Sequence, residues 1–177
     1  MSELSPTEPI TTLVLGFGNP LWGDDGAGIE AVNMLAEKQI PDGVRIEPAG
    51  LPGFGLAAWL EDTRLSSLRR LVLVDAARMG LEPGVWRRFT PEEVRLIARG
   101  GIVSLHEADL SSGLALSQAL GLLPEEVLFY AVEPGSLEDG PKLSPEVRDS
   151  LPEMVEELFL ELQNGRGKHD KQEDFDH

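Results

Sequence analysis

The chain has 177 residues, 41% of them hydrophobic, and carries 31 acidic against 15 basic side chains. This length and composition suit one domain with a hydrophobic core. The absence of cysteine excludes disulfides, a thiol nucleophile and Cys-ligated metal centres, and a formal charge of −16 without a Lys/Arg cluster argues against a nucleic-acid partner.

The two ends of the sequence differ in character from its centre. The N-terminal "MSELSPTEPI" has neither a basic nor an apolar signal region, and no apolar run reaches the roughly 18–20 residues that a bilayer span needs. We therefore expect a cytoplasmic protein with no membrane partner. It should have a flexible N-terminus over 1–10, a single α/β domain over 11–163 and a disordered polar tail over 164–177.

Strand-like and helix-like segments alternate along the chain. The expected strands cover 11–17, 44–50, 69–77, 82–89 and 125–135, and the expected helices cover 27–38, 55–63, 91–100, 111–121 and a last segment that begins at Ser144-Pro145. Pro152 interrupts the apolar stripe of that last helix, so we expect a kink or a two-part helix. The alternation predicts a three-layer α/β/α domain with a twisted, mostly parallel sheet.

The loop "GFGNPLWGDDG" after the first strand is the first candidate site. Gly16 and Gly18 fit a dinucleotide-binding fingerprint, but Leu21 occupies its third glycine position. Asp24 and Asp25 lie at a helix N-terminus, where they would repel a phosphate, so the loop suits a cation better. The alternative is that they cap the helix, which explains one aspartate well and two less well.

Polar residues also follow other strands. Ligands of an open α/β sheet bind beyond the carboxyl ends of its strands, and polar residues follow apolar, strand-like runs at four places: Asp24 and Asp25, Asp75, His106 and Glu133. His106 is the only histidine expected in the domain, because His169 and His177 lie in the polar tail. Two carboxylates and one imidazole suit a borderline metal ion with open coordination positions. Each residue also has a plainer alternative as a turn, cap or hydrogen-bonded side chain.

Four segments then resemble one known family, the hydrogenase maturation proteases. They are "GFGNPLWGDDGAGIEAV", "LVLVDAA", "SLHEADL" and "YAVEPGSLEDGPKLSPEVRDSLPEMVEEL", and the resemblance runs from about residue 11 to 162. It implies a hydrolase with aspartyl-type endopeptidase activity. Such an enzyme removes the C-terminal extension of a nickel–iron hydrogenase large-subunit precursor, its partner, after nickel insertion. The resemblance also implies that Asp25, Asp75 and His106 recognise nickel that arrives with this precursor.

One segment departs from the family pattern. Many relatives end the second strand with D-G-G-T, whereas this chain reads "EPAGLPG", with Glu47 just before Pro48. The departure leaves the peptide-binding edge and the exact substrate open. Two other functions remain as alternatives: a non-catalytic adaptor or chaperone that inspects a nickel site with the same three residues, and a less favoured nucleotide-binding α/β domain.

Overall fold

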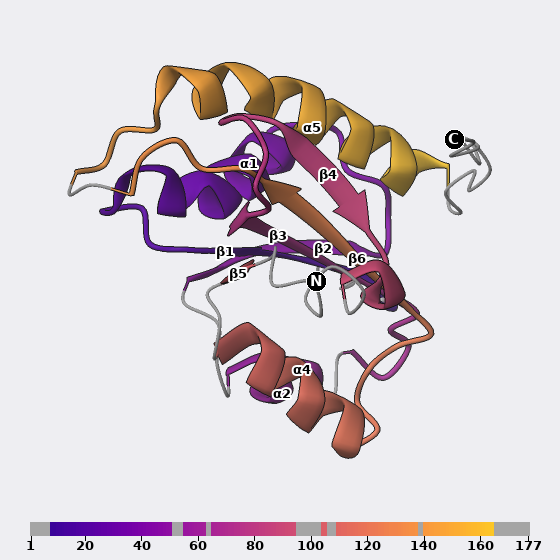
Figure 1. Cartoon of the computed structure of the whole chain (residues 1–177). Coiled ribbons are helices and arrows are strands. Elements are labelled where there is room, and N and C mark those ends of the chain that lie inside the picture. The colour runs from indigo at the N-terminus through magenta and orange to yellow at the C-terminus, as the bar shows by residue number, and fades with distance from the viewer. Residues whose placement is uncertain are drawn as a thin grey trace, which may run out of the picture.

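A computed structural model describes residues 8–50, 55–62, 65–94, 104–105, 109–137 and 140–164. These residues form three layers, in which α1 and α5 cover one face of a sheet and α2 and α4 cover the other (Figure 1). In chain order the elements are β1 Thr12–Phe17, the 3-10 turn η1 Gly23–Gly26, α1 Ala27–Ala36, β2 Val44–Gly50, α2 Gly55–Leu60, β3 Arg70–Arg78, β4 Trp86–Phe89, β5 Ser104–Leu105, α4 Asp109–Ala119, β6 Glu126–Val132 and α5 Pro145–Gln163.

The sheet has the strand order β2-β1-β3-β6-β4, with β5 paired to β3. The four strands β2, β1, β3 and β6 are parallel, while β4 and β5 run antiparallel to their neighbours. The predicted α/β/α architecture with a mostly parallel sheet is confirmed. Because the chain leaves β1 toward β2 on one side and returns to β3 on the other, a switch point lies at the carboxyl ends of β1 and β3, where such sheets bind ligands.

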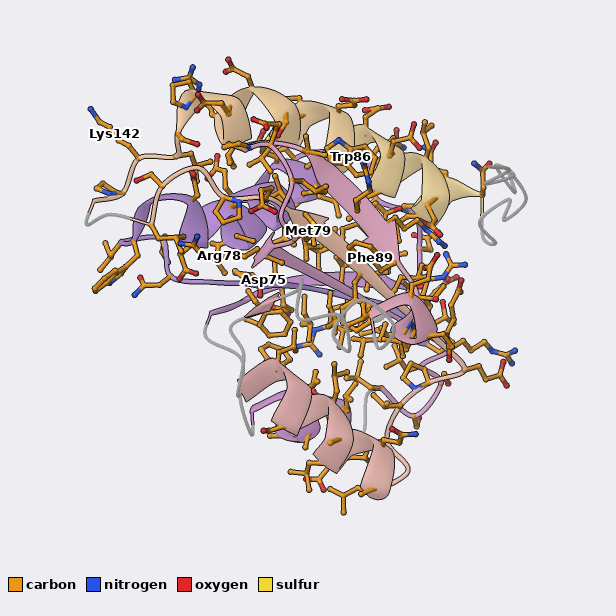
Figure 2. All side chains as sticks on the ribbon, viewed as in Figure 1. Asp75, Arg78, Met79, Trp86, Phe89 and Lys142 are labelled. Atoms are coloured by element: carbon orange, nitrogen blue, oxygen red, sulfur yellow. The ribbon has the colours of Figure 1, made fainter. Side chains whose placement is uncertain are left out.

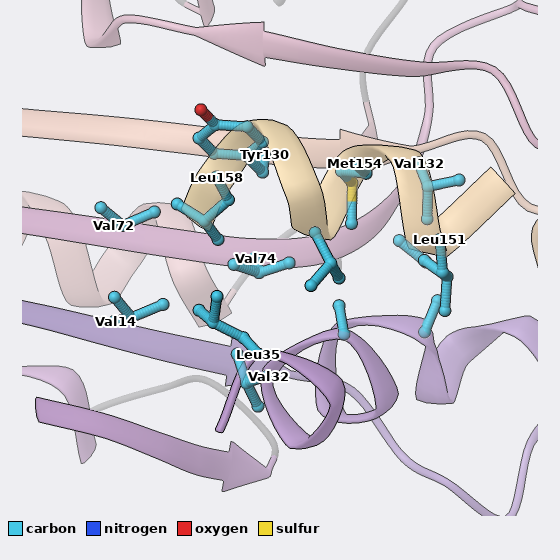
Figure 3. Packing of buried hydrophobic residues seen from close by; sticks show 14 of the residues in the cluster. Val14, Val32, Leu35, Val72, Val74, Tyr130, Val132, Leu151, Met154 and Leu158 are labelled. Carbon is cyan, nitrogen blue, oxygen red and sulfur yellow. The ribbon is translucent and has the colours of Figure 1, made fainter. Parts of the chain in front are cut away.

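Alternation along the strands divides the core between the two faces. One cluster joins Val14, Val72 and Val74 of the sheet to α1 and α5 (Figure 3). The other joins leucines at the alternate positions, such as Leu71 and Leu73, to α2 and α4. Full burial of one such side chain contributes about 1.5–3 kcal/mol, so both faces of the sheet hold their helices through many small contributions.

The predicted strands and the predicted helices over 27–38, 55–63 and 111–121 are confirmed with shifts at their ends, but the last helix differs. α5 is one uninterrupted helix over Pro145–Gln163, so of the two expected alternatives the two-part helix is wrong, while the kink stays a prediction. Pro152 lies on its exposed side, whereas Leu151 and Met154 are buried in the core. Packing of the apolar stripe therefore continues on either side of the proline.

The remaining expectations about the chain are tested only in part. The predicted helix over 91–100 is helical at 91–94, and its remainder lies outside the described residues, as do 1–7 and 165–177 of the predicted N-terminus and tail. Throughout the described ranges, no helix is both long and apolar enough to cross a membrane.

A buried ionic cluster ties β4, β6 and α5 together. Arg88 donates from Nε and Nη2 to the Glu161 carboxylate at 3.0 and 2.7 Å, and the Tyr130 hydroxyl donates to the same carboxylate. Trp86 stacks on the Tyr130 ring at 6.2 Å. Burial alone would raise the pKa of Glu161, but the hydrogen bonds from Arg88 and Tyr130 outweigh it and lower that pKa.

Glu161→Gln should lower the free energy of unfolding at pH 7 by about 2–4 kcal/mol, because Arg88 loses the charge that compensates its own partial burial. The lowered pKa of Glu161 means that its contribution is present above the ordinary value of 4.5 and is lost as pH falls through the folded-state pKa. The difference between wild type and variant should therefore shrink in acid, as measured by urea unfolding at pH 7 and below pH 4.

Glu156→Gln is the matched control, because the ion pair of Glu156 with Lys38 at 2.6 Å is largely exposed. Its loss should change stability by no more than about 1 kcal/mol. Equal effects of the two substitutions would show that the buried cluster adds nothing beyond a surface ion pair.

Candidate functional site

The backbone N–H groups of the loop that joins β1 to η1 are satisfied by hydrogen bonds within the loop and to other segments. Gly18 has φ +122, and a Cβ there would lie 1.7 Å from the Asp25 carbonyl oxygen, so only glycine fits. Every backbone N–H group from 18 to 25 has a protein acceptor (Pro20 has no N–H). Gly18, Gly23 and Asp24 donate to the carbonyl oxygens of Gly50, Gly140 and Ser136 in other segments. Asn19 donates to Asp25 Oδ2, Leu21 to Asn19 Oδ1, Trp22 to Asn19 O and Asp25 to Trp22 O within the loop. Phosphate-binding loops aim such N–H groups at the ligand, so this loop is not built for a nucleotide.

Asp24 is fully buried and is the centre of a hydrogen-bond network. Its Oδ2 accepts from Gly135 N and Ser136 N at 2.8 Å and from Ser144 Oγ at 2.7 Å, and its Oδ1 accepts from Ser144 N at 2.6 Å. Ser144 is the residue before α5, so Asp24 fastens the loop after β1 to the segment that leads from β6 into α5.

The hypothesis that these aspartates cap the first helix is wrong. The N-cap of α1 is Gly26, and no side chain makes the cap hydrogen bond. Asp24 and Asp25 precede the helix in η1 and are both buried. Their side chains serve other partners.

Asp25 and Asp75 come together at the switch point between β1 and β3. Asp25 lies in η1, and Asp75 lies in β3 one residue beyond Val74, the last β3 residue that pairs with β1. Both side chains are buried, and the negative charge of Asp25 acts on Asp75. Asn19 N donates to Asp25 Oδ2 and Ala76 N to Asp75 Oδ1, each at 2.8 Å.

Asp75 occupies a position that its strand otherwise gives to apolar side chains. Leu73 and Ala77, two residues to either side, belong to the core cluster beneath α2 and α4, and Figure 2 shows Asp75 on the part of β3 that leads to Arg78 and Met79. Desolvation raises the pKa of Asp75 to about 8; the hydrogen bond from Ala76 opposes this rise, and the charge of Asp25 adds to it. A carboxyl group perturbed in this way at a switch point indicates a functional site.

Asp75 also has unused bonding capacity. Its Oδ2 is buried and accepts no hydrogen bond from any described residue. A buried polar oxygen without a partner carries a desolvation penalty of about 1–3 kcal/mol, and such a group calls for an explanation. A cation or a donor group of a ligand would satisfy it.

The structure places two of the three predicted ligands, Asp25 and Asp75, near the switch point between β1 and β3. His106 lies outside the described residues, so its place in the site stays a prediction. The described chain reaches Leu105, which pairs with Ala77, two residues beyond Asp75. Across the described ranges, no group of three Asp, Glu or His side chains forms a metal site by itself.

Two further acids have structural partners. Glu133, at the end of β6, is buried, and its Oε2 accepts from Met79 N at 2.6 Å and Leu81 N at 3.2 Å, which fixes the turn after β3. Glu47 of β2 accepts from Arg45 Nε at 2.8 Å. Sequence reasoning missed the anchoring roles of Asp24 and Glu133, because their partners are far away along the chain.

Asp24→Asn should lower the free energy of unfolding by roughly 2–4 kcal/mol, because an amide has only one acceptor oxygen, whereas the carboxylate presents two acceptor oxygens to its four donors. Chemical unfolding monitored by circular dichroism measures this change. A variant as stable as wild type would show that the network around Asp24 contributes nothing to the fold.

For Asp75, the folded-state pKa is raised, so the free energy of unfolding should fall as pH rises from about 4 to about 8. Asp75→Asn removes this titration. The variant should gain stability relative to wild type by an amount on the order of a few kcal/mol between pH 5 and pH 9. Urea unfolding of both proteins across that range checks the sign, and a difference independent of pH would contradict it.

Comparison with known proteins places this geometry in context. Residues 29–161 match the sequence model of the hydrogenase maturation protease family. The hydrogenase expression/formation protein HupM of Azotobacter chroococcum mcd 1 is 36% identical over 141 residues, which cover 78% of this chain and 65% of HupM. HupD of Bradyrhizobium diazoefficiens is 35% identical over 141 residues, covering 78% of this chain and 71% of HupD.

Solved structures agree with the sequence relatives. The hydrogenase maturating endopeptidase HybD from E. coli superposes with a TM-score of 0.73 at 27% identity, covering 88% of this chain and 93% of HybD. The [NiFe] hydrogenase maturation protease HybD from Thermococcus kodakarensis has a TM-score of 0.70 at 31% identity, with 84% and 96% covered. With its sheet, its paired carboxylates and these relatives, the chain belongs to the hydrogenase maturation protease family.

Proposed function

We propose that this chain is a cytoplasmic endopeptidase that removes the C-terminal extension of a nickel–iron hydrogenase large-subunit precursor. Membership of the family supports the reaction class. The observation that carries the proposal is the pairing of two buried carboxyl groups, Asp25 and Asp75, at the switch point of the sheet. Peptide hydrolysis needs polar groups held in a water-poor environment beside the scissile bond, and the burial of both side chains supports that role.

In this proposal, Asp25, Asp75 and His106 contact nickel that the precursor carries into the site. Carboxylate oxygen and imidazole nitrogen are suitable ligands for a borderline metal ion, and three protein ligands leave positions for the precursor's own groups. Nickel is then part of the substrate. A precursor without nickel would lack the group that places its peptide beside the two carboxyl groups.

The hydrogen bonds of the loop support a division of labour between the adjacent aspartates. The four donors on Asp24 support a role in holding the loop. Asp25 is fixed by Asn19 N through Oδ2 and acts electrostatically on Asp75. Asp25 therefore suits contact with the substrate. The alternative of a nucleotide-binding domain is disfavoured, because the N–H groups of the loop already have acceptors.

Asp25→Asn should reduce processing of the nickel-loaded precursor by about 100-fold or more, the effect typical of removing one polar group from an active site. Asparagine keeps an oxygen for Asn19 N, so the free energy of unfolding should change by no more than about 1 kcal/mol. The measurement is the precursor's mass against time.

His106→Ala should reduce processing in the same way as Asp25→Asn. Wild type should not shorten nickel-free precursor.

Glu30→Gln is the control for the change in net charge, because Glu30 is an exposed acid of α1, close to Asp25 in sequence. This variant should process the precursor as wild type does. Full cleavage by folded Asp25→Asn would remove Asp25 from the mechanism. An intact precursor bound to the wild-type protein would instead indicate an adaptor.

A further inference from the structure

Two large apolar side chains lie exposed in the loop that carries Asp25. Leu21 is 65% exposed and Trp22 is 50% exposed, and they are adjacent in the turn before η1. The other large hydrophobic residues that the described chain exposes, Leu120 and Leu160, belong to the ends of different helical segments. Single exposed hydrophobic residues are ordinary, but an adjacent pair next to a functional site calls for a partner surface.

The exposure of this pair is built into a rigid turn. Leu21 N donates to Asn19 Oδ1 at 3.0 Å and Trp22 N donates to Asn19 O at 3.1 Å. Gly140 N donates to Leu21 O at 2.9 Å, and Gly23 N donates to Gly140 O at 2.7 Å. The backbone is held on both sides, so the two side chains have little freedom to fold back into the core. Preorganised apolar groups lose little entropy on binding.

The same turn is bonded directly to the candidate site. Asn19 N donates to Asp25 Oδ2 at 2.8 Å, and Asp25 N donates to Trp22 O at 3.1 Å. A peptide held at Asp25 therefore has its neighbouring residues within reach of Leu21 and Trp22. The pair also offers only one polar group, the indole N–H, so it suits an apolar segment.

We propose that Leu21 and Trp22 form a docking platform for an apolar segment of the precursor next to the scissile bond. This proposal rests on the proposed function. It identifies a second part of the substrate that the enzyme would bind, the apolar segment that the carboxyl groups do not contact. Continuity with Asp25 identifies the precursor as the occupant. The charge of −16 on the chain further disfavours an acidic segment there.

Steady-state processing of nickel-loaded precursor by Leu21→Ala, Trp22→Ala and the double variant tests the platform. Truncation of a buried aromatic anchor at an interface typically weakens binding by about tenfold or more. We expect KM to rise by that factor for Trp22→Ala, with kcat nearly unchanged. Trp22→Phe, which keeps an aromatic surface, should recover most of the loss. Leu120→Ala is the matched control, because Leu120 is 53% exposed and follows α4.

Binding measured separately keeps the platform testable if the proposed function fails. The precursor is titrated into each variant by calorimetry, whether or not it is cleaved. A weaker Kd for Trp22→Ala than for Leu120→Ala supports the platform even where wild type leaves the precursor intact. Equal Kd values for all variants, or no binding by wild type, overturn it. Self-association of wild type that is lost in Trp22→Ala, seen by analytical ultracentrifugation, also overturns it by making a second copy the occupant.

Discussion

The carboxylate of Asp24 accepts four hydrogen bonds from the segment that leads into α5, and the position of the site depends on this contact. Burying a carboxylate without donors costs several kcal/mol of free energy. Separating the loop after β1 from the segment before α5 would remove these donors and is therefore unfavourable. Ser144 shows the consequence. Ser144 is the N-cap residue of α5, but its hydroxyl donates to Asp24 and makes no cap hydrogen bond to its own helix.

The hydrogen bonds of Asp24 also position the next residue, Asp25. Because Asp24 fixes η1, the side chain of Asp25 is held at the end of β1, where its charge acts on Asp75. Asp75 itself replaces an apolar residue in a core-facing position of β3. A carboxyl group there opposes folding stability, as its raised pKa shows. Proteins keep such local conflicts at functional sites, where activity and stability pull in opposite directions.

The hydrogen bonds of the loop have two effects at once. They occupy the N–H groups that a nucleotide phosphate would need, and they hold Leu21 and Trp22 away from the core. A glycine-rich loop at this place in an α/β sheet usually binds a phosphate. Here its glycine serves close packing instead, since a Cβ on Gly18 would overlap the Asp25 carbonyl. The loop holds buried carboxyl groups and exposes the apolar side chains of Leu21 and Trp22.

Much of the fold could be predicted from the sequence, because strand and helix periodicity depends on neighbours within a few residues. The same patterns placed Asp25 and Asp75 after or near the ends of strands, and parallel strands bring their carboxyl ends to one edge. Those two positions needed no knowledge of distant contacts. The separate resemblance to a family supplied the reaction class, which periodicity alone does not contain.

The tertiary structure decided what depends on partners far along the chain. The donors that Asp24 binds lie 111 to 120 residues away, so no local pattern reveals that it anchors α5 rather than capping α1. Pro152 is tolerated within α5 because its side of the helix is exposed while the apolar stripe packs on the core. The raised pKa of Asp75 likewise arises from desolvation by side chains of other elements. Local sequence sets backbone preference, whereas burial and hydrogen-bond partners are set only when distant segments pack together.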